Sequence, residues 1–259
     1  MSMRLVRISM FALLLAFGGA FTALQAGAQD AEAAKQPVVY TYVAIFGVPR
    51  AQWGQYEKSQ VAERKTFDGL LADGTIVAYG AGTIEVHTGI NEPTHVSWWS
   101  STSVAGLMKT LEALRGIIAS EEGIAFTMHA DEITMSRNYN GKGGNAGGYI
   151  LVQNWKVKPG NGGDFADLFT KYRKPDLDAA VASGAISHYS LEEDVIHTDA
   201  PGVMTLVLTF PDAESIDKFY AGIDEMRKKH PLFQEVFGGL TDPSQHRDLL
   251  LRVSYSKNK

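Results

Sequence analysis

Apolar and polar positions follow the same order in two long segments of the chain. Each segment begins with a strand that is apolar on both faces, which indicates burial on both sides. A helix with one apolar stripe follows, then two strands, a second helix and a last strand. In the first segment the expected elements are strands at 38–48, 75–87, 96–99 and 126–137, and helices at 51–72 and from 104. In the second they are strands at 149–157, 185–197, 203–210 and 249–255, and helices around 165–172 and 216–226.

Matching residues in the two segments keep a constant spacing. The first helix of each segment closes at a glycine, Gly74 or Gly184, a residue suited to the left-handed conformation at a helix end (184 − 74 = 110). The strand that follows carries a tyrosine and ends at a histidine with the same spacing; these residues are Tyr79, His87, Tyr189 and His197. The chain is therefore an internal duplication of one β-α-β-β-α-β unit. Pro175 is expected to kink or restart the first helix of the second unit.

The sheet of each unit has a second apolar face that must be buried. The two helices lie on one face of the sheet, and the strands are apolar on the opposite face as well. The simplest cover is the other unit, with the two sheets face to face or closed into one barrel. The glycine-closed helix, the strand with Tyr and His, the hairpin and the capped helix after it resemble the dimeric α/β-barrel superfamily in its single-chain, tandem-repeat form.

The resemblance implies an α+β fold, in which two tandem β-α-β-β-α-β (ferredoxin-like) repeats pack as an intrachain α/β barrel. We expect the repeats at 38–137 and 148–259, joined by a Gly-rich linker at 138–147. Members of this superfamily include cofactor-free monooxygenases of the antibiotic-biosynthesis type and haem-handling enzymes, so the fold alone indicates little about function. It does imply that a small-molecule site lies between sheet and helices or inside the barrel.

The N-terminus has the three parts of a secretory signal. Two arginines precede an apolar run at 10–17, and small residues lead to an A-x-A site that ends at Ala28. We expect a signal peptide at 1–28 and a flexible leader at 29–37. The mature protein is then periplasmic or secreted, with no membrane contact after the signal is cleaved.

Charge and cysteine content narrow the partners. The formal net charge is −5, and it becomes −7 (−5 − 2) without the two signal arginines, which disfavours nucleic acid and anionic membrane surfaces. The chain has no cysteine, so disulfides, thiolate metal ligands and a cysteine nucleophile are excluded. A homo-oligomer stays open, because tandem members of the superfamily still expose sheet edges.

Polar residues stand in the second unit where the first unit has small or apolar ones. The replacements are Gln153, Asn154, His188 and Glu192, in place of Val43, Ala44, Ala78 and Gly82. Two of them, His188 and Glu192, share a strand parity and face the same side. The functional interpretation is a polar pocket beneath the extension at 228–245, with His188 as acid/base or ligand donor and Tyr189 or His197 in support. The alternative is that this face is simply exposed.

The two tyrosine–histidine pairs also have a functional and a purely structural interpretation. Tyr79 with His87, and Tyr189 with His197, could place a general base and a hydrogen-bond donor in one cavity. The alternative is that each tyrosine is a half-buried sheet residue and each histidine serves the hairpin turn.

Other histidines give weaker metal or haem candidates. The H-x-D pairs His129/Asp131 and His246/Asp248 match no ordered metal motif, so no metal is predicted, and polar turns explain them equally. In haem-handling members of the superfamily a helix-borne histidine binds the iron, which makes His230 the haem candidate. Beside two lysines it also fits a solvated helix end.

No catalytic motif or cofactor fingerprint is present, so no catalytic residue is assigned. The sequence favours an exported protein that binds a small apolar or aromatic molecule of unknown identity without a cofactor. The alternative is a cofactor-free monooxygenase-like or haem-handling enzyme.

Overall fold

In this computed structural model, residues 36–86, 92–118, 123–196 and 201–259 are described. Residues 37–259 form one compact unit. His87, His197 and the expected signal peptide lie outside the described residues, so those predictions stay predictions. Among the described helices, none is long and apolar enough to cross a membrane.

The elements follow the predicted order. The strands are β1 (Val39–Gly47), β2 (Ala78–Ile84), β3 (His95–Ser101), β4 (Met128–Gly141), β5 (Tyr149–Val157), β6 (His188–Asp194), β7 (Val203–Phe210) and β8 (Thr241–Asn258). The helices are α1 (Trp53–Ala72), α2 (Val104–Ile118), α3 (Gly162–Leu168), α4 (Lys174–Ala182), α5 (Ala213–Lys229) and α6 (Phe233–Leu240). A short 3-10 turn, Arg50–Gln52, precedes α1, and a π-helical turn, Phe169–Arg173, links α3 to α4. Pro175 lies in the first turn of α4, so the helix restarts there as predicted.

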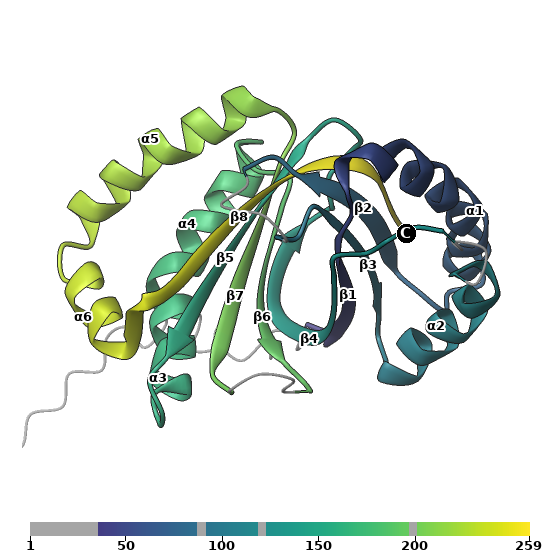
Figure 1. Ribbon diagram of the computed structural model, residues 1–259. Helices are drawn as coiled ribbons and strands as arrows, with labels where there is room; N and C mark the ends of the chain where they lie inside the picture. Colours follow the sequence, from purple (N-terminus) through teal and green to yellow (C-terminus); the bar gives the residue numbers. More distant parts are fainter. Residues whose placement is uncertain (1–35, 87–91, 119–122, 197–200) are drawn as a thin grey trace, which may run out of the picture. The chain divides into compact units, whose positions relative to one another are not determined.

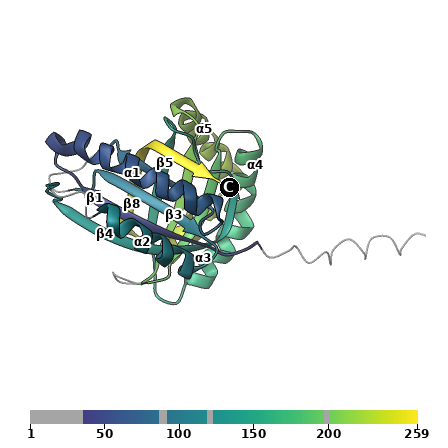
Figure 2. The same cartoon turned by 90° about the vertical axis from the view of Figure 1, so that its right-hand side faces the viewer.

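The strands close into one antiparallel barrel in the order β1-β3-β2-β8-β5-β7-β6-β4. Both halves have the same internal order, β4-β1-β3-β2 and β8-β5-β7-β6, and the pairs β2–β8 and β4–β6 join them. This order is consistent with two tandem ferredoxin-like repeats. Helices α1 and α2 lie on one side of the barrel and α3 to α6 on the other (Figures 1 and 2). A closed barrel has no free edges, so the edge argument for a homo-oligomer does not hold for the described strands.

The two final strands are longer than the sequence pattern predicted. Because β4 pairs with β1 along its first part and with β6 along its last, it continues to Gly141, through the first four residues of the expected linker. In the same way β8 starts at Thr241 rather than at 249, and pairs with both β5 and β2. The extension before it contains α6. Local sequence patterns indicate only the pairings within one half. The predicted strands were therefore shorter than the observed ones, which also pair with the other half.

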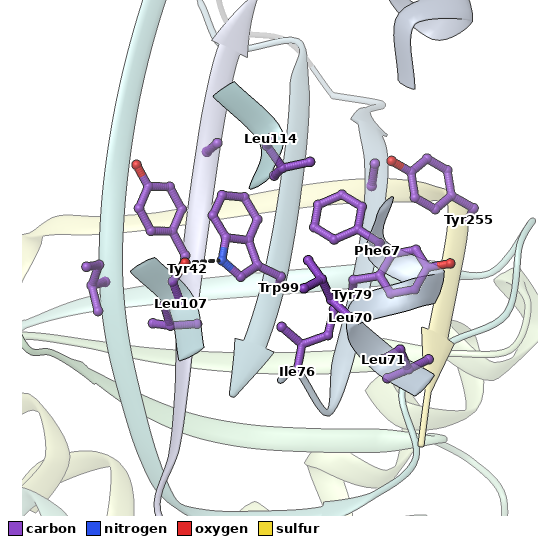
Figure 3. Packing of buried hydrophobic residues seen from close by; sticks show 13 residues of the cluster. Tyr42, Phe67, Leu70, Leu71, Ile76, Tyr79, Trp99, Leu107, Leu114 and Tyr255 are labelled. Atoms are coloured by element: carbon purple, nitrogen blue, oxygen red, sulfur yellow. Dashed lines mark hydrogen bonds between the residues drawn. The ribbon is translucent and has the colours of Figure 1, made fainter. Parts of the chain in front are cut away.

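The outer face of each half-sheet is filled by a tightly packed aromatic and aliphatic core. In the first half, Tyr42 stacks on Trp99 with ring centroids 4.3 Å apart, and Phe67 stacks on Tyr79 at 4.8 Å (Figure 3). The adjacent Trp98 packs instead with the apolar cluster inside the barrel, so the two tryptophans lie on opposite faces, as predicted. The second half has an equivalent outer core around Leu177 and Tyr189. The opposite face of each half-sheet points into the barrel.

Candidate functional site

A cavity of about 400 Å³ lies inside the barrel. All eight strands contribute inward-facing side chains to it, because alternate residues of a strand point to the same side. Most of the wall is apolar; it includes Val39, Val43, Val96, Trp98, Ile150, Val152, Val207 and Leu251. At one end the lining reaches Lys142 and Lys259, both exposed, so the cavity meets solvent there. Its size is within the usual range for small-molecule sites.

The cavity exists because the two halves fill the barrel differently. In the first half Gly80 pairs with Trp98, and the Trp98 ring lies so close over the glycine that a Cβ there would overlap it. The matching pair in the second half is Ser190 and Val207. Valine is much smaller than tryptophan, so the interior of the second half is left partly open.

The β6 wall of the cavity is polar and contains two titratable groups, while other strands add single hydroxyls such as those of Thr41, Ser100 and Ser136. The inward residues of β6 are His188, Ser190 and Glu192, where β2 of the first half has Ala78, Gly80 and Gly82. Glu192 is only 9% exposed. Its two carboxylate oxygens accept hydrogen bonds from the hydroxyls of Ser190 (2.6 Å) and Thr134 (2.5 Å).

The environment of Glu192 favours its protonated form. Burial raises the pKa of the Glu192 carboxyl, and the nearby charge of Asp194 acts in the same direction, against the two hydroxyl hydrogen bonds. Glu192 therefore keeps its proton to a higher pH than an exposed glutamate does. A protonated carboxyl can donate a hydrogen bond as well as accept one.

His188 presents a neutral imidazole to the cavity. Burial lowers the pKa of His188 from 6.5 to about 4, so the ring is uncharged at neutral pH. Within the described part of the chain, no group is hydrogen-bonded to this ring, although a neutral imidazole offers one donor and one acceptor. His188 and Glu192 are four residues apart on one strand, which separates them by roughly 13 Å. A ligand lying along β6 would meet one polar group near each end.

The lowered pKa of His188 predicts a pH-dependent stability. Since the unfolded state binds the proton first, the free energy of unfolding falls as pH drops from about 6.5 to 4 and is fully retained above 6.5. Between pH 7.5 and pH 4.5 the titration of His188 lowers the free energy of unfolding by roughly 2–3 kcal/mol. We expect His188→Gln to lack that share of the loss in urea titrations at the two pH values. Apart from residue 188 the two proteins have the same titratable groups, so the difference between them isolates His188; equal losses would contradict the assignment.

Among the sequence-predicted site residues that the structure describes, His188 and Glu192 line this cavity and the others do not. Tyr79 and Tyr189 are buried on the opposite, helix-covered face of the sheet. The side-chain oxygen of Asn154 accepts a hydrogen bond from the Thr205 hydroxyl (2.7 Å), and neither Asn154 nor Gln153 is part of the lining.

The polar wall does not lie beneath the extension, contrary to the sequence-based expectation. The extension instead packs α6 against α3 and the outer core, where Phe237 contacts Trp155 and Phe165. His188 and Glu192 point the other way, into the barrel, because their strand parity is opposite to that of Tyr189.

Both tyrosines instead form a repeated contact at the joins between the halves. The Tyr79 hydroxyl donates to Asp68 (2.7 Å), and the Tyr189 hydroxyl donates to Asp178 (2.6 Å). Each aspartate also accepts a hydrogen bond from the other half, Asp68 from Lys257 (2.6 Å) and Asp178 from Asn140 (2.8 Å). Burial, followed by the neighbouring aspartate, raises the pKa of both tyrosines. The sequence pattern did not lead us to predict a role for Asp68 and Asp178, although the two residues have the same spacing of 110 (178 − 68).

These contacts predict small, equal effects. Tyr79→Phe and Tyr189→Phe are each expected to lower the free energy of unfolding by about 1 kcal/mol, because each removes one hydrogen bond. Urea denaturation of the two single variants at pH 7 measures this. A loss in one variant and none in the other would show that the two joins are not equivalent.

The remaining candidates lie apart from the cavity. The imidazole of His129 is 3.1 Å from the Asp131 carboxylate and stacks on Phe46. Likewise, His246 is 3.3 Å from the Asp248 carboxylate and stacks on Trp155. No group of three or more potential metal ligands occurs among the described residues.

His230 does not fit the role of a haem ligand in the cavity. It follows α5, packs edge-on against Tyr172, and has its Nε2 4.0 Å from the Asp176 carboxylate. It is not part of the lining, where His188 is the one histidine among the described residues.

Comparison with solved structures identifies the class of fold. The chain is similar to a monooxygenase-like protein of Fusobacterium nucleatum (TM-score 0.62, 14% identity, 86% of this chain and 95% of that one). It is also similar to one of Lactobacillus acidophilus (0.61, 10%, 85% and 96%) and to an anthrone oxidase-like protein (0.53, 10%, 86% and 93%). No family model matches the sequence, and no curated protein sequence matches it. At these identities the similarity establishes the fold alone: the chain has the dimeric α/β-barrel fold, closed within a single chain.

Proposed function

We propose that this protein binds a small, largely apolar and aromatic molecule inside the barrel. The observation that carries the proposal is the cavity itself, an apolar chamber with one polar wall made by His188, Ser190 and Glu192. Apolar walls and the Trp98 ring favour an aromatic body, because burial of apolar surface drives binding. His188 and Glu192 favour a ligand with a hydrogen-bonding group near each end, since polar groups fix orientation in a pocket.

We further infer that the barrel consists of two tandem ferredoxin-like repeats that have diverged. The first repeat fills its share of the interior with Trp98, whereas the second has the smaller Val207 and the polar residues of β6. The binding role then belongs mainly to the second repeat. Export through the signal at 1–28 would place this activity in the periplasm or outside the cell.

A cofactor-free oxygenase is the second candidate, on two observations. Two of the similar structures are monooxygenase-like proteins, and His188 places a neutral imidazole in an apolar cavity. Such a ring could accept a proton from a ligand hydroxyl. A base with a pKa of about 4 is weak at neutral pH, however, which favours binding over catalysis.

The test combines identification of the natural ligand with a probe titration. Native mass spectrometry of protein purified from its own source is expected to show a small-molecule adduct, which chromatography and mass spectrometry of an extract then identify. In parallel, the uncharged aromatic probe N-phenyl-1-naphthylamine should bind saturably, one molecule per chain, with increased fluorescence. The absence of saturable probe binding would overturn the proposal. Oxygen uptake on addition of the identified ligand would shift the assignment to the oxygenase.

A further inference from the structure

A second hollow lies outside the barrel, between α4 and α5. It is a groove of about 660 Å³, on the side of the barrel away from α1 and α2 (Figure 1). Apolar side chains line much of it, among them Leu177, Phe219, Ile223 and Met226. Nothing in this groove belongs to the barrel cavity, because the two linings share no residue.

The groove results from a difference between the two halves. At the spacing of 110, Ala180 in the groove corresponds to Leu70, and Leu177 corresponds to Phe67. In the first half both larger side chains are buried, Leu70 at 8% exposure and Phe67 at 0%, in the core that also includes residues of α2. The smaller second-half residues do not fill the corresponding space between their helices.

Two cations that line this groove have no carboxylate within ion-pair distance in the part of the chain that the structure describes. The Arg173 guanidinium lies over the Phe219 ring, 5.6 Å from its centroid, and no described carboxylate is within ion-pair distance of it. Lys218 also lines the groove without such a partner among the described residues. The groove's own carboxylates have other cationic partners: Asp176 pairs through Oδ1 with Lys229 (3.0 Å), and Glu225 pairs with Lys228 (2.6 Å). The second oxygen of Asp176, Oδ2, is buried and has no hydrogen-bond partner among the described residues; the His230 imidazole lies 4.0 Å from it.

The buried, positively charged environment of Arg173 favours an anion as the ligand of this groove. Burial lowers the pKa of the Arg173 guanidinium, and the nearby Arg227 acts in the same direction, against the attraction of Asp176. A carboxylate bound to the guanidinium would offset both effects and form two parallel hydrogen bonds. The apolar floor beside it would bury a hydrocarbon chain.

We propose that the groove between α4 and α5 binds a long-chain carboxylate, with its head on Arg173 and its apolar chain along Phe219, Ile223 and Met226. The inference is independent of the function proposed for the barrel cavity. Lys218 adds attraction for the head group from the opposite helix.

Calorimetric titration with dodecanoate and dodecanol, both below the concentrations at which they aggregate, tests the head group. The full chain should bind dodecanoate saturably and at least about tenfold more tightly than dodecanol, because a charged hydrogen-bonded pair is lost with the alcohol. Arg173→Met should remove this preference, and Arg173→Lys should retain part of it. Lys218→Met should reduce dodecanoate affinity without altering the position of Arg173. Equal affinity for acid and alcohol would overturn the proposal.

Two further variants locate the site. Ala180→Leu restores the first-half residue and should abolish dodecanoate binding while the circular dichroism spectrum stays unchanged. The double variant Ser190→Gly/Val207→Trp alters only the barrel cavity and should bind dodecanoate like the wild type. If the cavity variant loses binding, the site lies in the barrel. If Ala180→Leu changes the oligomeric state in light scattering and leaves dodecanoate binding intact, the groove serves a second copy of the chain. Either result would overturn the proposal.

Discussion

The double variant Ser190→Gly/Val207→Trp is expected to lose saturable binding of N-phenyl-1-naphthylamine and to remain folded. It copies into the second half the pair that fills the first, where the Trp98 ring lies directly over Gly80. The indole should occupy the same space over residue 190 and fill much of the cavity, leaving no room for an aromatic ligand. Fluorescence titration of the probe measures the loss, and thermal unfolding followed by circular dichroism checks the fold.

Single variants provide the controls for this experiment. Val207→Trp alone should destabilise the protein by about 1–3 kcal/mol, because the Ser190 Cβ stands where the ring must lie. Ser190→Gly alone should keep the cavity and bind the probe, although it removes one hydrogen bond to Glu192. Probe binding by the folded double variant at wild-type affinity would place the site elsewhere and refute the cavity as the binding site.

Gly141→Ala is expected to lower the free energy of unfolding by about 3 kcal/mol or more. Gly141 ends β4, at the join with β6, and has a φ of +85° that costs other residues about 1–2 kcal/mol. A Cβ there would also overlap the Ser187 carbonyl oxygen and lie 3.0 Å from the His188 Cα. Because these are backbone atoms, they can yield only if the strand pair separates, and the overlap adds to the conformational cost.

Gly147→Ala is a matched control, because it separates the two costs. Gly147 has the same φ of +85°, but a Cβ there would meet no atom within 4 Å. This substitution should therefore lose only the conformational share, about 1–2 kcal/mol. Urea denaturation of both variants at pH 7 measures the difference. Equal losses would show that β4 and β6 are not in close contact at Gly141, and the closure of the barrel at this join would need revision.

The sequence by itself determined the parts of this fold that depend on local patterns. Strand and helix periodicity, the helix-closing glycines and the spacing of 110 predicted the order of the elements and the opposite directions of Trp98 and Trp99, and they predicted two repeated units with which the strand order is consistent. They also identified His188 and Glu192 as residues on one strand face that differ from their small counterparts. Such features depend on residues close together in the chain, or on a comparison of the chain with itself.

Only the tertiary structure decided how the halves join and where the open spaces lie. The pairing of β4 with β6 and of β8 with β2 lengthened both final strands and closed the barrel, which no pattern within one half could reveal. The barrel cavity depends on the small Val207 side chain opposite Ser190. The groove depends on the small Ala180 side chain opposite α5. Both spaces are therefore set by the sizes of side chains on separate elements. The same strand parity that sends Glu192 into the cavity sends Tyr189 to Asp178 on the outer face. The strand pairing between the halves and the positions of the cavity and the groove depend on packing between residues that are distant in the sequence. A pattern along the sequence does not contain this information.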